Sequence, residues 1–346
     1  MGGAIYPFLK NNLAASTLHD FSLWTSSYST TNPPPKELIT KVFNSELHSP
    51  IGTAAGIDRN ALAPHLYKLG FGFVEIGSVV PVAERRSSSA EEINHLGSKW
   101  TATEERLGVN WVKFKLKDWG NSFRGISIQP NSESQRAIPH FCDEEYVLCF
   151  NEMYPFADYL VVNVADTQPN KLSQYKDLRR LRKLIRKLVD ARDVQIGMSV
   201  TCHLTGHNLP KPKKLVPSIL VKVESNYEKP KELVDLCIEE GVEGLLVGGT
   251  DSEGQGGTHL TKSSLETLKE VYTHSKGKLV IISCGGVTSG KEVLERIKHG
   301  ASLVQVYSLV VLEGPQVIHR LNQELFEAMK EQGFSTLSEA FGVNIN

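Results

Sequence analysis

Short apolar segments alternate with amphipathic segments along most of the chain. Eight segments are rich in β-branched or other apolar residues, and most are continuous rather than alternating, as is typical of strands that are covered on both faces. These eight predicted strands are Ile51–Ala54, Phe73–Ile76, Arg124–Ile128, Tyr159–Val164, Ile219–Val223, Gly244–Val247, Leu279–Ser283 and Leu303–Tyr307. The pattern indicates an α/β protein whose strands are buried.

The segments between these strands carry signals for the start and the end of helices. Pro230 stands at a first helical position, and Gly241 follows the apolar residues as a stop. Ser289 and Glu292 have the spacing of a capping box, and Gly300 ends that segment. Eight strands that alternate with helices predict a (β/α)8 TIM barrel. An open doubly wound sheet is the alternative, because periodicity does not reveal closure.

The start of the chain differs in character from the rest. It is dense in large apolar residues and ends in a run of three prolines, residues 33–35. We therefore expect an N-terminal helical segment at 1–44, followed by the barrel at 45–346. Two interpretations of this segment stay open. It is a helical cap on the barrel floor, or residues 1–30 form amphipathic helices that contact a membrane or an apolar ligand.

Composition narrows the functional classes. The 346 residues are 40% hydrophobic and 22% charged, which is typical of a globular protein, and a net charge of −1 gives no general attraction to nucleic acid. The basic run 179–187 alternates with apolar residues and is interpreted as the solvated face of a helix. Five cysteines without a C-x-x-C spacing predict neither a disulfide framework nor a zinc site, so no metal is expected. No apolar run reaches the ~18 residues of a transmembrane helix, and no secretory or Arg-rich transit signal is visible.

Residues with candidate chemistry follow several predicted strands, where barrel enzymes build their sites. Gly285 and Gly286 follow the seventh strand, and Tyr307 and Ser308 follow the eighth. Glycine lets backbone N–H groups approach an anion, so these two loops predict a phosphate site, with a tight turn as the alternative. Lys222 interrupts an apolar run, where a lysine needs a negative or electron-rich partner. Asn163 likewise ends an apolar strand and must find hydrogen-bond partners.

Several long segments together resemble the dihydroorotate dehydrogenase family, most closely its membrane-associated, quinone-using class. They are SPIGTAAGIDRN (49–60), LYKLGFGFVEIGSVVP (66–81), ADYLVVNV (157–164), ILVKV (219–223) and CGGVTSGKEVLERIKHGASLVQVYS (284–308). The resemblance runs from about residue 45 to the C-terminus. It implies an FMN flavoprotein that oxidises dihydroorotate to orotate in pyrimidine synthesis, with ubiquinone as acceptor. It also implies the mitochondrial inner membrane, although a cytosolic location stays open without a visible targeting signal.

The resemblance also implies roles for individual residues. Lys222 would lie beside the isoalloxazine ring and stabilise its reduced anion. Arg59 and Thr250 would contact the substrate, and Asn94 and Asn163 would contact flavin or substrate. The remaining flavin contacts, of which the last four would hold the phosphate, are Ala54, Ala55, Gly56, Gly77, Ser78, Gly285, Gly286, Tyr307 and Ser308.

The main departure from the family concerns the catalytic base. The family motif N-[VL]-S-[SC]-P-N places a Ser or Cys before the proline, whereas this chain reads NVADTQPN at 163–170. Asp166, or Thr167 beside it, takes the place of the base, and Gln168 precedes the proline. A carboxylate is more basic than a neutral hydroxyl, but it would stand close to an anionic substrate.

Three other departures lie on the substrate side of the predicted site, and a fourth lies near the phosphate. Arg59 replaces a family lysine, Ser127 a strand-three asparagine, Gly249 an asparagine on strand six, and Lys262 a glycine near the phosphate. Three hypotheses follow. The protein is a working dihydroorotate dehydrogenase, or a catalytically degenerate member that keeps the barrel as a binding or regulatory protein. The third is a flavin reductase for another substrate that fits the pocket opened by the glycines.

Overall fold

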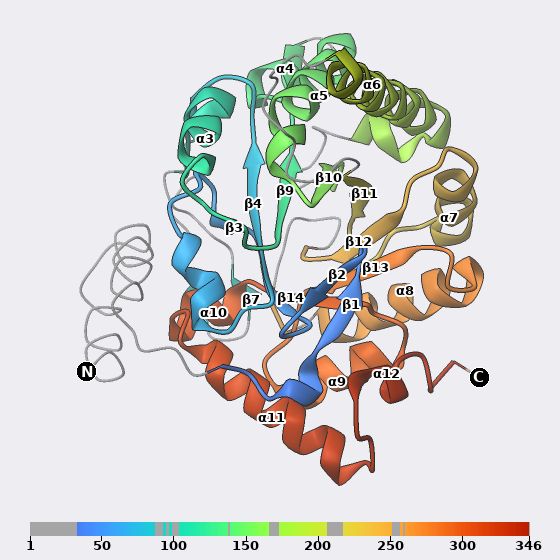
Figure 1. Ribbon diagram of the computed structural model, residues 1–346. Coiled ribbons are helices and arrows are strands. Elements are labelled where there is room, and N and C mark those ends of the chain that lie inside the picture. Colours follow the sequence, from blue (N-terminus) through green and yellow to red (C-terminus); the bar gives the residue numbers. More distant parts are fainter. Residues whose placement is uncertain are drawn as a thin grey trace.

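The computed structural model describes most of the chain beyond the prolines. The described residues are 33–86, 93–94, 97–98, 104–137, 139–165, 173–205, 217–250, 257–258 and 260–345. At its centre, eight parallel strands close into a barrel in the order β10-β11-β12-β13-β14-β3-β4-β9 (Figure 1). Closure confirms the (β/α)8 TIM barrel, and the open doubly wound sheet is wrong.

All eight predicted strands are present, with small shifts at their ends. Their bounds are β3 (Ile51–Asp58), β4 (Phe73–Val79), β9 (Arg124–Ile128), β10 (Tyr159–Asn163), β11 (Ser218–Val223), β12 (Gly244–Gly248), β13 (Val280–Cys284) and β14 (Leu303–Val306). The pairing of β14 with β3 joins the last strand to the first. Because every strand is covered by helices outside and by packed side chains inside, the continuous apolar runs of the sequence follow from the fold.

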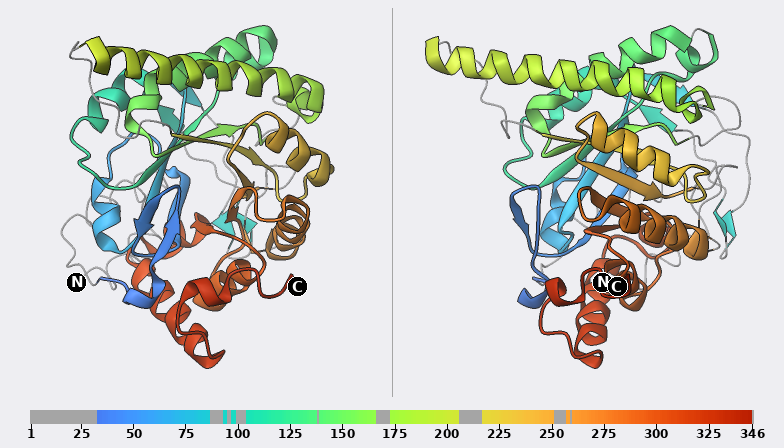
Figure 2. Two further views of the ribbon diagram at one scale, coloured as in Figure 1. Left: turned by 45° about the vertical axis from the view of Figure 1, so that its right-hand side comes forward. Right: turned by 90° about the vertical axis from the view of Figure 1, so that its right-hand side faces the viewer.

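Helices surround the barrel on its outer side (Figures 1 and 2). The α-helices are α3 (Gly108–Leu116), α4 (Ser132–Ala137), α5 (Pro139–Met153), α6 (Leu178–Thr205), α7 (Pro230–Glu239), α8 (Leu260–Ser275), α9 (Gly290–Lys298), α10 (Ser308–Glu313), α11 (Val317–Glu331) and α12 (Leu337–Ala340). Short 3-10 helices are η1 (Lys36–Leu38), η2 (Pro64–Leu69), η3 (Tyr154–Phe156) and η4 (Ser173–Lys176). Two local predictions are confirmed: Pro230 begins α7, and Ser289 and Glu292 form a complete capping box on α9.

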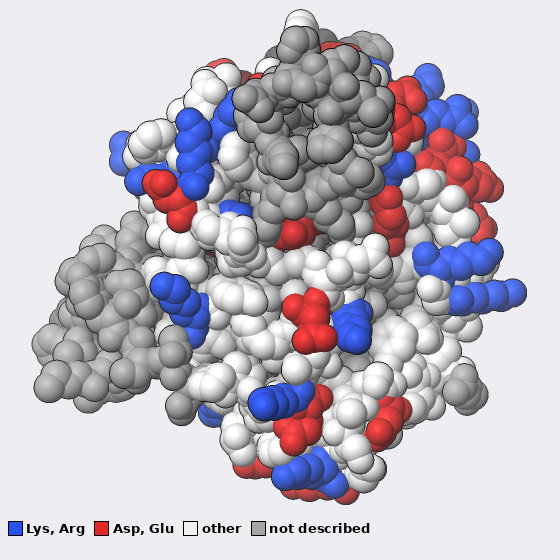
Figure 3. All heavy atoms as spheres, viewed as in Figure 1, with Lys and Arg blue, Asp and Glu red and all other residues white. Residues whose placement is uncertain are grey.

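The basic run of the sequence lies on α6, and two of its arginines pair with carboxylates at the end of α7. Arg186 and Arg182 form ion pairs with Glu240 at the end of α7, the Arg186 Nε lying 2.7 Å from the carboxylate. Figure 3 shows basic and acidic side chains mixed on the surface rather than separated. α6 runs on past the barrel (Figure 2, right). The structure thus agrees with a solvated helix face that also pairs with α7.

A β-hairpin closes the floor of the barrel, at the amino ends of the strands. It consists of β1 (Thr40–Val42) and β2 (Ser45–Leu47) and lies in front of the barrel in Figure 1. Phe43 at its turn stacks on Tyr159, with ring centroids 5.5 Å apart. Residues 1–32 lie outside the described residues, so the predicted helical segment stays a prediction. The predicted boundary at 44–45 falls inside this hairpin.

Candidate active site

The opposite end of the barrel, where the strands finish, carries the polar side chains of the candidate site. Lys222 points into the barrel near this end, from the second-last residue of β11. Glu75 points into the barrel from deeper inside, level with Tyr159 at the start of β10, and its carboxylate is completely buried. This carboxylate accepts hydrogen bonds from Gln305 (2.6 Å) and Tyr159 (3.1 Å). Burial raises the pKa of the Glu75 carboxyl, whereas the positive charge of Lys222 and the two hydrogen bonds lower it in part. An interior lysine therefore faces an interior carboxylate.

Gly249, directly after β12, lies against the Lys222 side chain. A Cβ placed on Gly249 would come within 3.7 Å of the Lys222 Nζ and 3.6 Å of the Cys284 sulfur. Gly249 has a φ of +99°, a conformation that other residues rarely adopt. The Thr250 carbonyl accepts a hydrogen bond from the Ser225 N–H (2.9 Å), which ties this loop to the end of β11. The Lys222 ammonium therefore lies next to the backbone of Gly249 and close to the Cys284 side chain.

A group of amides and hydroxyls forms a second wall of the site. The Asn163 amide donates to the Ser78 hydroxyl (3.0 Å) and to the Gln129 amide oxygen (3.3 Å), and the Ser78 and Ser127 hydroxyls lie 3.0 Å apart. The Asn163 side-chain oxygen is buried and has no partner among the described residues. Tyr146 of α5 fixes the strand from behind by donating to the Asn163 carbonyl (2.6 Å). The arrangement leaves an acceptor that a ligand donor can satisfy.

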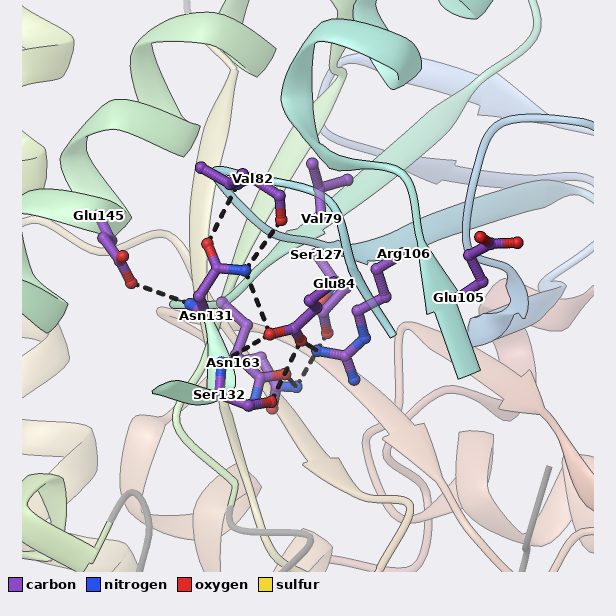
Figure 4. Close-up of polar contacts among 12 residues, drawn as sticks. Val79, Val82, Glu84, Glu105, Arg106, Ser127, Asn131, Ser132, Glu145 and Asn163 are labelled. Atoms are coloured by element: carbon purple, nitrogen blue, oxygen red, sulfur yellow. Dashed lines mark hydrogen bonds and ion pairs between the residues drawn. The ribbon is translucent and has the colours of Figure 1, made fainter. Parts of the chain in front are cut away.

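A polar cluster beside this wall connects two loops of the same barrel end (Figure 4). The Glu84 carboxylate, in the small ladder of β5 (Glu84–Arg86) and β8 (Glu104–Arg106), accepts from the Ser132 N–H (2.7 Å) and the Asn131 amide (3.1 Å). It also pairs with Arg106 at 3.4 Å. The loop after β4 is thereby attached to the loop after β9, and the positions of Ser78 and Ser127 are supported from outside.

The two glycines after β13 form a tight loop whose carbonyls face the protein. Gly285 and Gly286 have φ values of +98° and +71°, and a Cβ on Gly286 would lie 2.4 Å from the Thr261 hydroxyl. That hydroxyl donates to the Gly286 carbonyl (2.9 Å), and Arg296 donates to the Gly285 carbonyl. Among the described residues, the Gly286 N–H has no acceptor. A backbone donor is therefore free for an anion at the predicted phosphate site.

Tyr307 and the end of β3 complete this side. The Tyr307 ring lies against Gly56, where a Cβ would be only 2.9 Å from the ring, and its hydroxyl accepts a hydrogen bond from Arg59 (3.4 Å). Ala54 is buried in the barrel wall, Ala55 follows it in the same strand, and Ser308 is the first residue of α10. The structure therefore gathers the glycine loop, Tyr307 and the end of β3 on the barrel end that also carries Lys222.

Three predicted residues cannot be placed in this site from the described residues. Asp166 and Thr167, the candidates for the base, lie outside them. Asn94 is in the two-residue strand β6 (Ile93–Asn94), which pairs with β7 (Gly97–Ser98), but its side chain is outside the description as well. Lys262 lies in α8 with its side chain 87% exposed, so it points to solvent and does not fill the phosphate loop.

Sequence reasoning missed three residues that the structure brings to the site. Glu75 interrupts an apolar strand just as Lys222 does, so the same signal could have identified it. Gln129 is two residues beyond Ser127 and supplies an amide beside the shorter serine side chain. Arg296 lies on an amphipathic helix, where arginine is usually solvated, and no sequence signal marks it as buried.

Comparisons with known proteins agree on one family. The family model described as dihydroorotate dehydrogenase matches residues 37–329. Mitochondrial dihydroorotate dehydrogenase (quinone) of Mus musculus is 32% identical over 89% of this chain and 80% of the relative. Dihydroorotate dehydrogenase (quinone) of Xanthobacter autotrophicus is 27% identical over 90% of this chain and 89% of the relative. Among solved structures, a dihydroorotate dehydrogenase of Eimeria tenella in complex with ferulenol superposes with a TM-score of 0.80 at 23% identity, covering 99% of both chains.

Proposed function

Since the chain belongs to the dihydroorotate dehydrogenase family, we propose that it is an FMN oxidoreductase that oxidises dihydroorotate to orotate and passes the electrons to a quinone. Two features at one end of the barrel carry this proposal. The first is the interior Lys222 beside the backbone of Gly249, and the second is the loop of Gly285 and Gly286, in which the Gly286 N–H has no acceptor among the described residues. The first suits a flat, electron-accepting ring and the second suits a phosphate.

The residues present fit FMN in two independent respects. Gly249, Gly285 and Gly286 all have positive φ values, a backbone conformation that glycine adopts readily and other residues rarely do, and a Cβ on Gly286 would collide with Thr261. The unsatisfied Gly286 N–H is a donor of the kind that holds phosphate oxygens. Gly285, Gly286, Tyr307 and Ser308 would hold the phosphate, and Ala54, Ala55, Gly56 and Ser78 would line the ring, as the family resemblance implies.

The chain's own side chains would divide the chemistry between them. When bound, FMN accepts the two electrons that leave the substrate. Lys222 holds a positive charge beside the site, where it stabilises negative charge that develops during reduction. Asn163 would offer its unpartnered amide oxygen to a donor of the substrate or the ring, and Arg59 and Thr250 would contact the substrate, as the family resemblance implies. We propose Asp166, or Thr167 beside it, as the group that takes the substrate proton.

The acceptor and the location extend the same proposal. Relatives named for a quinone acceptor share most of this chain, and some of them are named mitochondrial. We propose a quinone as acceptor, contact with a membrane through residues 1–30, and the mitochondrial inner membrane as the site of action. In the part of the chain that the structure describes, no helix is long and apolar enough to cross a membrane.

Purification followed by anaerobic titration tests the proposal. The purified protein should be yellow, and dihydroorotate added without oxygen should bleach the flavin absorption, with a ubiquinone analogue restoring it. An Asp166→Asn variant should bind flavin but bleach much more slowly; Asp177→Asn, an exposed carboxylate ahead of α6, is the control.

Two other outcomes would contradict the assigned activity. Bound flavin that dihydroorotate does not bleach would point to another substrate, for which the glycine at 249 and the serine at 127 have altered the pocket. A colourless protein that cannot be reconstituted with FMN would indicate a binding or regulatory role for the barrel.

A further inference from the structure

Arg296 is a buried cation directly behind the glycine loop. It extends from α9, only 2% of its surface is exposed, and it is among the largest side chains that are completely enclosed. Its guanidinium donates to the hydroxyls of Ser283 (2.6 Å) and Ser264 (3.0 Å) and to the Gly285 carbonyl. All three acceptors are neutral.

Among the described residues, no carboxylate forms an ion pair with Arg296. Glu292 acts on its charge only as a longer-range electrostatic attraction. The carboxylate of Glu292, one turn earlier, is already occupied. Its Oε2 accepts from the Ser289 N–H (3.2 Å) in the capping box and from the Thr288 N–H (2.6 Å) and hydroxyl (2.9 Å). Burial lowers the pKa of Arg296 to about 10, which leaves the guanidinium protonated at neutral pH. A buried cation without an anionic partner is costly, so a counter-charge is expected nearby.

We propose that the missing counter-charge is the phosphate of the bound flavin nucleotide, and that Arg296 is the positioning residue of its site. The inference rests on the proposed function, since it needs a phosphate-bearing ligand. By holding the Gly285 carbonyl toward the interior, Arg296 orients the following peptide so that the Gly286 N–H is presented outward. Its charge adds to the field at the same loop, although neutral groups lie between guanidinium and ligand.

The test compares FMN with riboflavin, which has the same ring and no phosphate. Flavin is removed from the purified protein, and each compound is titrated by fluorescence quenching. Arg296→Met should weaken FMN binding about tenfold to a hundredfold, the size of one lost charge-assisted interaction, and leave riboflavin binding unchanged. The FMN dissociation constant of the variant should also depend less on salt. Arg296→Lys, which keeps the charge, should recover much of the preference for FMN.

A second buried arginine provides the matched control. Arg124 is 3% exposed and also donates to a backbone carbonyl, but it lies at the start of β9, at the floor end of the barrel. Arg124→Met should change stability without changing the ratio of the two affinities. If Arg296→Met does not fold, Ser264→Ala, which removes one anchor of the guanidinium, should lower FMN affinity selectively.

The outcomes separate this inference from the proposed function. Equal loss of FMN and riboflavin binding in Arg296→Met, or no loss of either, would overturn the role of Arg296 while leaving a flavoprotein. A wild-type protein that binds both compounds equally well would overturn the phosphate site, and one that binds neither would overturn the flavin assignment itself.

Discussion

Charged residues inside a barrel help to locate a functional site. They are visible in the sequence as interruptions of apolar strands, and the folded protein must supply partners for their charges. Lys222 was predicted as an interior residue from its apolar surroundings, and Glu75 carries the same signal in the run Phe73–Ile76. Lys222 and Glu75 face each other only because the sheet closes into a barrel, since their strands β11 and β4 are not neighbours in it. Which charges face each other therefore could not be predicted from either strand alone. The burial of Arg296 could not be predicted, because its partners lie on β13, on α8 and in the loop after β13, and not on its own helix.

Replacing Lys222 tests its role beside the flavin. Lys222→Ala should purify with at least about tenfold less tightly bound flavin, because the ring loses its positive neighbour and Glu75 is left as an unpaired buried acid. The ratio of flavin to protein, taken from absorption spectra, measures the effect. Lys231→Ala, an exposed lysine of α7, is the control. Unchanged flavin content in Lys222→Ala would remove Lys222 from the site.

Glu75 should make stability depend on pH in a predictable direction. Because burial raises its folded pKa above the unfolded value, the folded state binds the proton more tightly, and stability is lost as pH rises through the folded pKa. Glu75→Gln imitates the protonated form. The melting temperature of Glu75→Gln minus that of the wild type should therefore increase from pH 5 to pH 8. A difference that stays constant or shrinks with pH would contradict this.

Local sequence signals predicted elements well where the deciding contacts are themselves local. Ser289 and Glu292 are three residues apart, and the capping box follows from that spacing. The segment after β3 behaves differently. Leu62, Leu66 and Leu69 have the spacing of the apolar face of a helix, yet Leu62 is 51% exposed and only the 3-10 helix η2 forms. The reason is Asp58, whose carboxylate accepts the N–H groups of Leu62 (2.9 Å) and Ala63 (2.8 Å) and turns the chain before Pro64.

The cap of α9 gives a prediction at this scale. Ser289→Ala should lower the free energy of unfolding by about 1 kcal/mol, because the Glu292 N–H loses its acceptor at the first turn. Thr336 at the start of α12 is a matched control, since it occupies an N-cap position without making a capping hydrogen bond. Thr336→Ala should change stability by a few tenths of a kcal/mol at most, which is about the cost of a neutral surface substitution. Equal costs in urea denaturation would show that the box contributes nothing.

Contacts between the two ends of the chain hold the whole molecule together. Asn322 of α11 accepts from the Ser49 hydroxyl (2.7 Å) and donates to the Gly70 carbonyl (3.0 Å), so the last long helix is fixed to both ends of the first βα unit. Periodicity predicted each of these elements but not their contact, because 273 residues separate the hydrogen-bonded pair. The contacts at the floor of the barrel could not be predicted either, because η1 and the hairpin pack on strands that come much later in the sequence.

The floor predicts where the chain can be shortened. Leu38 and Val42 are buried and Phe43 stacks on Phe123 and Tyr159, so a protein beginning at residue 45 should be less stable than one beginning at residue 33. Losing three such side chains should cost roughly 5 kcal/mol, at about 1.5–3 kcal/mol for each. Thermal unfolding of the two shortened proteins measures the difference. FMN affinity should stay the same wherever the barrel still folds, because the proposed flavin site lies at the opposite end. Equal melting temperatures for the two proteins would mean that residues 33–44 contribute nothing to the stability of the barrel.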